Sequence, residues 1–209
     1  MTVAELNNAT LTECRYRRNK MSDEDLLALF RKTGALLDGH FVLRSGLHSG
    51  QYFQCALLLQ HTDIAERVCK QLSEKLHRFD CDAVISPALG GIIVGQEVGH
   101  SLGKRHIFVE KESGKLVLRR GFQILLTKRS SWLKTWSRAA VASRRPSISW
   151  QAHDGIVAAV GVIVDRSGKN KPDFGYLFVS LIEMNVETFE PDRLPADLVK
   201  IPAVKPGSK

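Results

Sequence analysis

Two turns of this chain carry residue types that could bind an anion. In the first, two short β-prone runs within residues 39–54 flank a turn that is rich in serine and glycine and carries Arg44 and His48. This pattern predicts a hairpin whose tip offers cationic and hydroxyl donors. An anion could bind there, but a tip that is only solvated has the same composition, and the turn alone leaves both interpretations open.

The second turn lies within Asp82–Gly103, the stretch on which the predicted fold is centred. A short apolar run, Ala83–Ser86, is followed by Gly90-Gly91, and from Ile92 the apolar residues recur at helical spacing. This order predicts strand, tight turn and helix, so backbone N–H groups at the helix start could approach an anion outside the carboxyl end of the strand. An ordinary turn that binds nothing has the same pattern.

The rest of the chain supplies the elements that would position these turns. We expect helices at residues 22–32 and 63–79, strands at 105–109, 156–164 and 176–184, a polar loop at 110–115 and a second hairpin at 116–122. The strand at 156–164 is an almost continuous apolar run, which is typical of a strand buried on both faces. It ends at the sequence D-R-S-G, residues 165–168.

Composition indicates one globular domain. The chain has 209 residues, of which 44% are hydrophobic and 25% are charged. The four cysteines form no C-x-x-C pair and no zinc spacing, so we expect reduced thiols, no cysteine-bound metal and a cytoplasmic protein. The sequence contains neither an apolar run of about 18 residues that could span a membrane nor a signal peptide.

The net charge of +8 would suit an acidic partner such as nucleic acid, but the excess belongs to two segments. Residues 125–151 contain six basic residues and no acid, and residues 1–20 contain four basic residues against two acids. Residues 1–20 are polar without sustained periodicity, so we expect a non-structural extension there and a single domain at 21–209. Met21 is an alternative start, and an organelle-targeting peptide is the weaker interpretation.

Five motifs in order carry a resemblance to a known family. They are F-x-L-x-S-G-x-x-S (41–49), S-P-A-L-G-G-I (86–92), E-K-E-x-G-K with L-R-R-G-F (110–122), V-D-R-S-G (164–168) and I-P-A-V-K-P-G-S (201–208). Over residues 22–124 and 152–209 the chain resembles bacterial orotate phosphoribosyltransferases, which are type I phosphoribosyltransferases. Several independent motifs in the right order are far more specific than one glycine pattern.

The resemblance implies a fold and a reaction. The fold would be a Rossmann-like α/β domain in which a central parallel sheet, flanked by helices, carries a small β hood. The enzyme would transfer the 5-phosphoribosyl group of 5-phosphoribosyl 1-diphosphate to orotate, giving orotidine 5′-monophosphate and pyrophosphate in UMP biosynthesis, with Mg²⁺. Family members are homodimers whose loop around residues 111–119 reaches the neighbouring subunit's site, and neither nucleic acid nor membrane would be a partner.

The resemblance also assigns roles to residues. Arg44 matches the phosphate-contacting base of the first turn, and the guanidinium of Arg166 would take the orotate carboxylate. Lys111 and Arg119 would act in catalysis by facing the pyrophosphate, whose growing charge needs cations and Mg²⁺. The remaining substrate-binding positions are Ser45, Gly46, Tyr52, Phe53 and Gly90. For Arg166, a salt bridge with neighbouring Asp165 is the alternative.

The main signature of the family is absent. Between residues 124 and 153 the family has a buried strand, two adjacent acids and a glycine-rich loop for the 5-phosphate, whereas residues 125–151 contain no glycine, no acid and all three tryptophans of the chain. Backbone amides without glycine cannot closely approach a phosphate. Since burying unpaired cations costs free energy, we expect this stretch to be excluded from the sheet by being pushed to the surface or left disordered, or the chain to fold poorly, and we expect catalysis to fail.

The genetic code suggests a cause for the altered stretch. Tryptophan has the single codon TGG, and with plausible choices for the other codons a one-base shift from Arg129 onward reads I-I-L-V-E-D-V-V-T-R-G-G, which is the missing signature. We hypothesise one shift near residue 125 and a compensating shift near residue 151. The alternatives are a genuine insertion, an inactive binding or regulatory module with the phosphoribosyltransferase fold, and a nucleic-acid binder whose Trp- and Arg-rich stretch stacks on bases.

Overall fold

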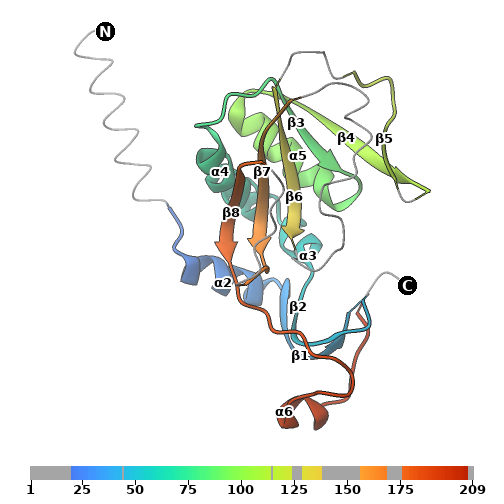
Figure 1. Cartoon of the computed structure of the whole chain (residues 1–209). Helices are drawn as coiled ribbons and strands as arrows, with labels where there is room; N and C mark the ends of the chain where they lie inside the picture. Colours follow the sequence, from blue (N-terminus) through green and yellow to red (C-terminus); the bar gives the residue numbers. More distant parts are fainter. Residues whose placement is uncertain are drawn as a thin grey trace.

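The computed structural model of the chain describes residues 20–43, 45–113, 115–123, 129–137, 156–168 and 176–206. Residues 1–19, Arg44 and residues 138–155 lie outside these ranges, and so do the expectations that rest on them. The described residues form a six-stranded sheet, a separate two-stranded sheet and five helices (Figure 1).

The six-stranded sheet has the order β5-β4-β3-β6-β7-β8. Its strands are β3 (Ala83–Pro87), β4 (Arg105–Glu112), β5 (Lys115–Leu118), β6 (Arg129–Ser137), β7 (Ile156–Asp165) and β8 (Phe178–Glu183). All neighbouring strands pair in parallel except β4 and β5, which form an antiparallel hairpin. The expected apolar strand is β7, which is buried from Ala159 to its end.

Two helices pack side by side against this sheet. α4 (Thr62–Leu76) contacts β7 and β8, and α5 (Gly90–Leu102) contacts β3, β4 and β6. α4 buries Ala65, Val68, Leu72 and Leu76, which lie three or four residues apart, as on one face of an amphipathic helix. None of the described helices combines the length and the hydropathy that a membrane span requires.

The structure describes three further helices, each shorter than α4 and α5. α2 (Asp23–Lys32) begins at Ser22, whose side chain forms a capping box with Asp25, so the expected helix start is confirmed. α3 (Cys55–Leu59) follows the two-stranded sheet directly, and α6 (Ala196–Val199) lies near the carboxyl terminus.

The two-stranded sheet is an antiparallel hairpin of β1 (Leu36–Val42) and β2 (His48–Phe53). This hood lies beyond the carboxyl ends of β7 and β8, and the chain after β8 continues along it (Figure 1). That segment bridges both edges of the hood, because Phe189 pairs with His48 and Val204 pairs with Phe41. The predicted fold, a parallel α/β sheet with a small β hood, is therefore confirmed.

The predicted polar loop after Val109 is wrong. Residues 110–112 continue β4, and β5 begins immediately after the turn, so the charged residues belong to a hairpin. Apolar residues occupy alternate positions of this hairpin, which is the pattern of a strand. The charged residues between them hide this pattern in the sequence. Leu116 and Leu118 pack with Val109 in one apolar cluster on one face of the hairpin.

β6 occupies the centre of the sheet, where it pairs with β3 on one side and β7 on the other. The expectation that the altered stretch is excluded from the sheet is therefore wrong for Arg129–Ser137. A strand at the centre of a parallel sheet is normally a near-continuous apolar run, whereas this strand reads R-S-S-W-L-K-T-W-S. Local sequence and position in the fold disagree here.

At the β8 edge of the sheet, a lysine side chain of α4 contacts the outer strand. β8 is the outer strand on that side. Lys75, in the last turn of α4, donates hydrogen bonds from its Nζ to the carbonyl oxygens of Ser180 and Leu181, each 2.8 Å long. Burial lowers the pKa of this lysine from its ordinary value.

Candidate active site

The carboxyl ends of the parallel strands meet at the edge of the sheet that faces the hood. In the paired registers Pro87 of β3 lies opposite Val109 of β4, and Asp165 of β7 lies opposite Ser137 of β6 and Glu183 of β8. Ligands of open parallel sheets bind outside this edge. The candidate site is therefore the space between the strand ends and the hood.

Arg166 joins the sheet to the hood at this edge. It follows β7 directly, and its guanidinium carbon lies 5.4 Å from the centre of the Phe53 ring at the end of β2. Phe53 in turn packs edge-on against Phe30 of α2, with ring centres 5.9 Å apart. A cation held over an aromatic face has a defined position, which suits a guanidinium that must meet a planar anion.

The turn after β7 is fixed by Asp165. One carboxylate oxygen of this buried residue accepts a hydrogen bond from the Ser167 N–H at 2.9 Å, and its carbonyl oxygen accepts one from the Met184 N–H. Asp165 thus shapes the backbone on which Arg166 is mounted.

Ser167 is a candidate site residue that the sequence reasoning missed. Its side chain is buried, with 7% of the residue exposed, and its Oγ has no hydrogen-bond partner. Buried hydroxyls are normally satisfied, so an orphaned one beside Arg166 indicates a group that awaits a ligand. Its place directly after the expected arginine was the only signal in the sequence.

The turn of the hood carries three of the expected substrate residues, of which Arg44 lies outside the described residues. Ser45 and Gly46 are exposed at its tip, where Gly46 has a φ of +84° that favours glycine. The turn is closed by hydrogen bonds from the Leu43 N–H to the Leu47 carbonyl at 2.8 Å and from the Gly46 N–H to the Leu43 carbonyl at 2.9 Å.

Tyr52 and Phe53 lie on opposite faces of β2, because consecutive residues of a strand alternate. Tyr52 packs against Phe41 of β1, with ring centres 5.7 Å apart, while Phe53 is buried beneath Arg166. The structure therefore does not bring the two rings to one surface. Their joint assignment to the orotate ring stays a prediction.

The glycine-containing turn after β3 is tight at Gly91. A Cβ atom there would lie 2.9 Å from Cδ of Pro87, so this position requires glycine for close approach. Gly90 begins α5, whose N-cap residue Leu89 makes no capping hydrogen bond through its side chain. The N–H of Ala88 donates to the carbonyl of Val109 at 2.7 Å, which ties this turn to β4.

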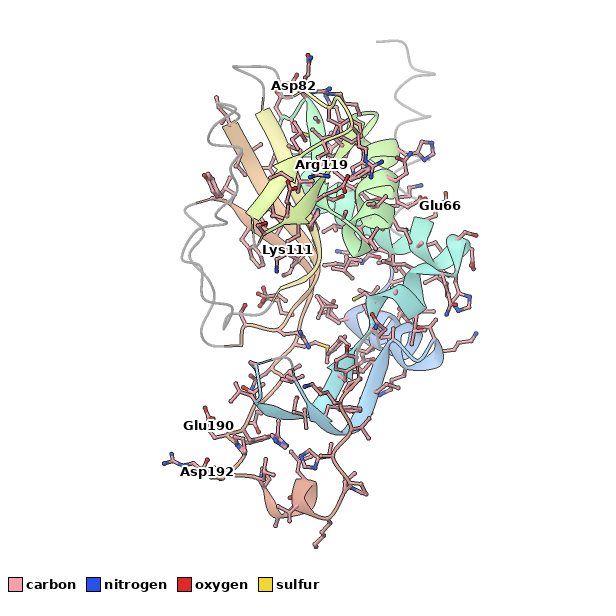
Figure 2. All side chains as sticks on the ribbon, turned by 90° about the vertical axis from the view of Figure 1, so that its right-hand side faces the viewer. Glu66, Asp82, Lys111, Arg119, Glu190 and Asp192 are labelled. Carbon is pink, nitrogen blue, oxygen red and sulfur yellow. The ribbon has the colours of Figure 1, made fainter. Side chains whose placement is uncertain are left out.

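Lys111 and Arg119 lie on opposite faces of the β4–β5 hairpin (Figure 2). Lys111 is paired with Leu116 and so shares the face of the apolar cluster, whereas Arg119 forms an ion pair with Glu112 on the other face. The next arginine, Arg120, binds Glu110 at 2.9 Å. The structure therefore does not bring the two expected catalytic cations together.

Two groups near the site have shifted pKa values, and each shift has a physical cause. The hydrogen bond from Arg120 lowers the pKa of Glu110, so this partly buried carboxylate is charged at neutral pH. Burial raises the pKa of the Cys55 thiol to about 12, although the nearby Arg166 acts in the opposite direction. Cys55 is thus a protonated, buried thiol and no candidate nucleophile.

The described residues do not provide a set of donors that would enclose a metal ion. Within the described ranges no three His, Cys, Asp or Glu side chains come together in a way that could coordinate one. The two adjacent acids of the expected signature are absent from the sequence between residues 125 and 151.

Comparisons with known proteins agree with this arrangement. No protein-family model matches the chain. The chain is 41% identical over 189 residues to an orotate phosphoribosyltransferase of Pelotomaculum thermopropionicum, covering 90% of this chain and 99% of the relative. It is 40% identical over 192 residues to that of Erythrobacter litoralis, covering 90% and 99%.

Solved structures give the same fold. The orotate phosphoribosyltransferase of Aeropyrum pernix superposes with a TM-score of 0.58 at 25% identity, covering 76% of this chain and 93% of that one. The Mycobacterium tuberculosis enzyme in complex with inorganic phosphate superposes with a TM-score of 0.60 at 17% identity, covering 77% and 95%. The two relatives at about 40% identity show that the chain belongs to the orotate phosphoribosyltransferase family.

Proposed function

We propose that the protein transfers the 5-phosphoribosyl group of 5-phosphoribosyl 1-diphosphate to orotate, giving orotidine 5′-monophosphate and pyrophosphate in pyrimidine biosynthesis. The observation that carries this proposal is the placement of Arg166, held over Phe53 between the strand ends and the hood. A guanidinium in that position suits the planar carboxylate of orotate. The names of the relatives at about 40% identity support the same reaction.

In this proposal the orotate site is built from two turns. Arg166 binds the carboxylate, and the orphaned hydroxyl of Ser167 supplies a further hydrogen bond beside it. Ser45 and Gly46 close the site from the hood, and Phe53 supports Arg166 from beneath. Arg44, in the same turn, contacts phosphate. Binding between two separately anchored turns would orient the ring nitrogen toward the ribose before any bond changes.

The diphosphate leaves from the other side of the same edge. The turn at Gly90 and the first N–H groups of α5 suit an anion, because a helix start carries unsatisfied donors and a positive dipole end. Lys111 and Arg119 neutralise the charge that grows as the bond to pyrophosphate breaks. Because the two cations lie on opposite faces of one hairpin, we propose a homodimer in which the hairpin of one subunit also serves the neighbouring site.

In this proposal Mg²⁺ binds together with the substrate. The described residues offer no metal cage, and Mg²⁺ is commonly held by substrate phosphates with one or two carboxylates, so here it would accompany 5-phosphoribosyl 1-diphosphate as its counter-ion. Its chemistry there is to neutralise diphosphate charge. We also propose a cytoplasmic location, since none of the three cysteines that the structure describes is in a disulfide.

We further propose that residues 125–151 arise from the paired one-base shifts. The position of β6 supports this, because the shifted reading I-I-L-V is the apolar run that a strand between β3 and β7 should have.

A paired assay tests these proposals. Orotate, 5-phosphoribosyl 1-diphosphate and Mg²⁺ are supplied to the chain as written and to a chain with the restored frame, and orotidine 5′-monophosphate is measured by chromatography. We expect product from the restored chain alone. If neither chain makes product, the proposed reaction is contradicted; if only the chain as written does, the frame hypothesis fails.

A further inference from the structure

Two histidines of the hood form a hydrogen-bonded pair. His40 of β1 is buried, with 5% of the residue exposed, and its Nε2 lies 2.6 Å from Nδ1 of His48, the first residue of β2. The two ring centres are 4.8 Å apart. The other ring nitrogen of His40, Nδ1, lies 2.8 Å from the carbonyl oxygen of Ile201. Neither histidine has a role in the proposed reaction.

The partners of this pair determine where its hydrogens lie. A carbonyl oxygen only accepts, so His40 must carry a hydrogen on Nδ1 and donate it to Ile201. In a neutral imidazole the other nitrogen then has a lone pair, so Nε2 of His40 accepts. His48 must therefore donate from Nδ1, and the hydrogen bonds run in one direction, from His48 through His40 to Ile201.

The backbone around the pair binds the hood to the segment that follows β8. On the β1 side the Val42 N–H donates to the Val204 carbonyl and the Val204 N–H donates to the His40 carbonyl, both at 2.8 Å. On the β2 side His48 and Phe189 exchange two backbone hydrogen bonds of 2.9 Å. One stretch of chain thus holds both outer edges of the hairpin, and the histidine pair connects the two strands between them.

The turn of the hood that carries Ser45 and Gly46 directly precedes His48 of this pair. Residues 43–47 separate Val42 from His48, and their hydrogen bonds between Leu43, Gly46 and Leu47 are the ones that close the turn. A rotation or slip of His48 would move the carboxyl-terminal end of the turn relative to its start. Hydrogen bonds to buried, fixed partners resist such a movement.

We propose that the His40–His48 pair is a positioning element that fixes the turn of residues 43–47 against the carboxyl-terminal segment at Ile201. The pair does not touch substrate; it acts through the turn that carries Ser45 and Gly46. The consequence for orotate rests on the proposed function, whereas the effect on the turn does not.

The test compares two replacements of one histidine. His48→Asn keeps an N–H donor at the second side-chain position, as Nδ1 of histidine provides, whereas His48→Leu keeps bulk and removes the donor. The matched control is His61→Leu, an exposed histidine at the start of α4 whose side chain makes no capping hydrogen bond. The readout is amide hydrogen exchange at Leu43 and Gly46, measured by NMR on the full chain, with Ile85 of β3 as the internal reference.

We expect exchange at Leu43 and Gly46 to accelerate at least tenfold in His48→Leu and to stay within threefold in His48→Asn and His61→Leu. Long-range ¹⁵N–¹H spectra should show His40 protonated at Nδ1 in the unchanged chain and in His48→Asn. Titration calorimetry should show orotate binding at least tenfold weaker in His48→Leu and within threefold in His48→Asn.

Other outcomes overturn the proposal. Unchanged exchange at the turn in His48→Leu contradicts it, and so does equal acceleration in both His48 variants, because the donor would then be irrelevant. Equal acceleration at Ile85 would indicate general destabilisation in place of local positioning. If the chain with the restored frame binds no orotate while the exchange difference is present, the proposed function fails and the positioning role stands.

Discussion

The guanidinium carbon of Arg166 lies 5.4 Å from the centre of the Phe53 ring, so the end of a central strand and the end of a hood strand share one contact. Phe53 is itself held by Phe30, and the backbone before and after Arg166 is held by Asp165. The arginine is thus positioned by groups on both sides of the candidate site. Its removal should therefore affect one ligand selectively.

We expect Arg166→Ala to weaken orotate binding about thirtyfold, about 2 kcal/mol, because the carboxylate loses a charged hydrogen-bond partner. Binding of 5-phosphoribosyl 1-diphosphate should change less than threefold. Calorimetric titration with each ligand, in the chain with the restored frame, checks this, and Arg193→Ala at an exposed position is the control. Equal losses for both ligands would contradict the assignment of Arg166.

Ser167→Ala should separate stability from binding. Since the buried hydroxyl has no partner, its removal should leave the free energy of unfolding unchanged or raise it by up to about 0.5 kcal/mol, while orotate binding weakens about fivefold. Urea unfolding and orotate titration measure the two effects. Ser22→Ala is the control with the reverse pattern, because loss of the α2 cap costs about 1 kcal/mol of stability without touching the site. A large loss of stability in Ser167→Ala would mean that the hydroxyl has a structural role.

Gly95→Ala should be strongly destabilising. A Cβ at this position of α5 would lie 2.2 Å from Nε2 of His106 and 2.6 Å from Oγ of Ser86, which are hydrogen-bonded to each other at 2.8 Å. Overpacking and the lost hydrogen bond should together cost about 3 kcal/mol in urea unfolding. Gly103→Ala, in open space but with a φ of +64°, should cost about 1 kcal/mol. A smaller effect at Gly95 than at Gly103 would show that α5 does not pack on β4 as described.

His106 should make the stability depend on pH. Burial lowers its pKa below the ordinary value of 6.5, so below that pH the unfolded chain binds a proton that the folded chain does not. The folding stability that neutral His106 contributes is fully present above pH 6.5. It is lost as the pH falls toward the pKa of His106 in the folded state. Urea unfolding between pH 7.5 and 5.5 should show a steeper decline in the unchanged chain than in His106→Gln. Parallel declines would assign the effect to other groups.

Restoring the frame across residues 125–151, so that the segment reads I-I-L-V-E-D-V-V-T-R-G-G, should recover soluble expression and activity together. The apolar run would match the central position of β6, the acids would hold the ribose hydroxyls and the glycine amides would bind the 5-phosphate. Soluble yield and rate of orotidine 5′-monophosphate formation are measured in parallel. A control that carries the same composition in scrambled order should recover neither. An inert, poorly soluble restored chain would disprove the frame hypothesis.

Much of the fold could be predicted from periodicity. The capped helix after Ser22, the buried strand ending at Asp165 and the strand, turn and helix around Gly91 all follow from local patterns that tertiary packing did not override. The extended β4–β5 hairpin was missed because its outward-facing charges resemble a loop, and only its apolar alternate positions reveal a strand.

The site was predicted less completely, for geometric reasons. Motifs assigned Lys111 and Arg119 to one pyrophosphate, but the register of the hairpin turns them to opposite faces, and a register cannot be read from one strand alone. Ser167 and the pair of His40 with His48 stand out only through burial and distances between elements. The place of Arg129–Ser137 in the sheet could not be predicted because the neighbours of β6 determine it, while its own sequence opposes it.

The contact of Lys75 with β8 has a consequence for self-association. An outer strand usually offers its carbonyl oxygens as a template on which another extended chain can add, and this is how many sheets begin to polymerise. Here one of those oxygens, on Ser180, already accepts a hydrogen bond from a lysine that also brings a positive charge to the edge. The sheet is thereby protected against open-ended growth at β8.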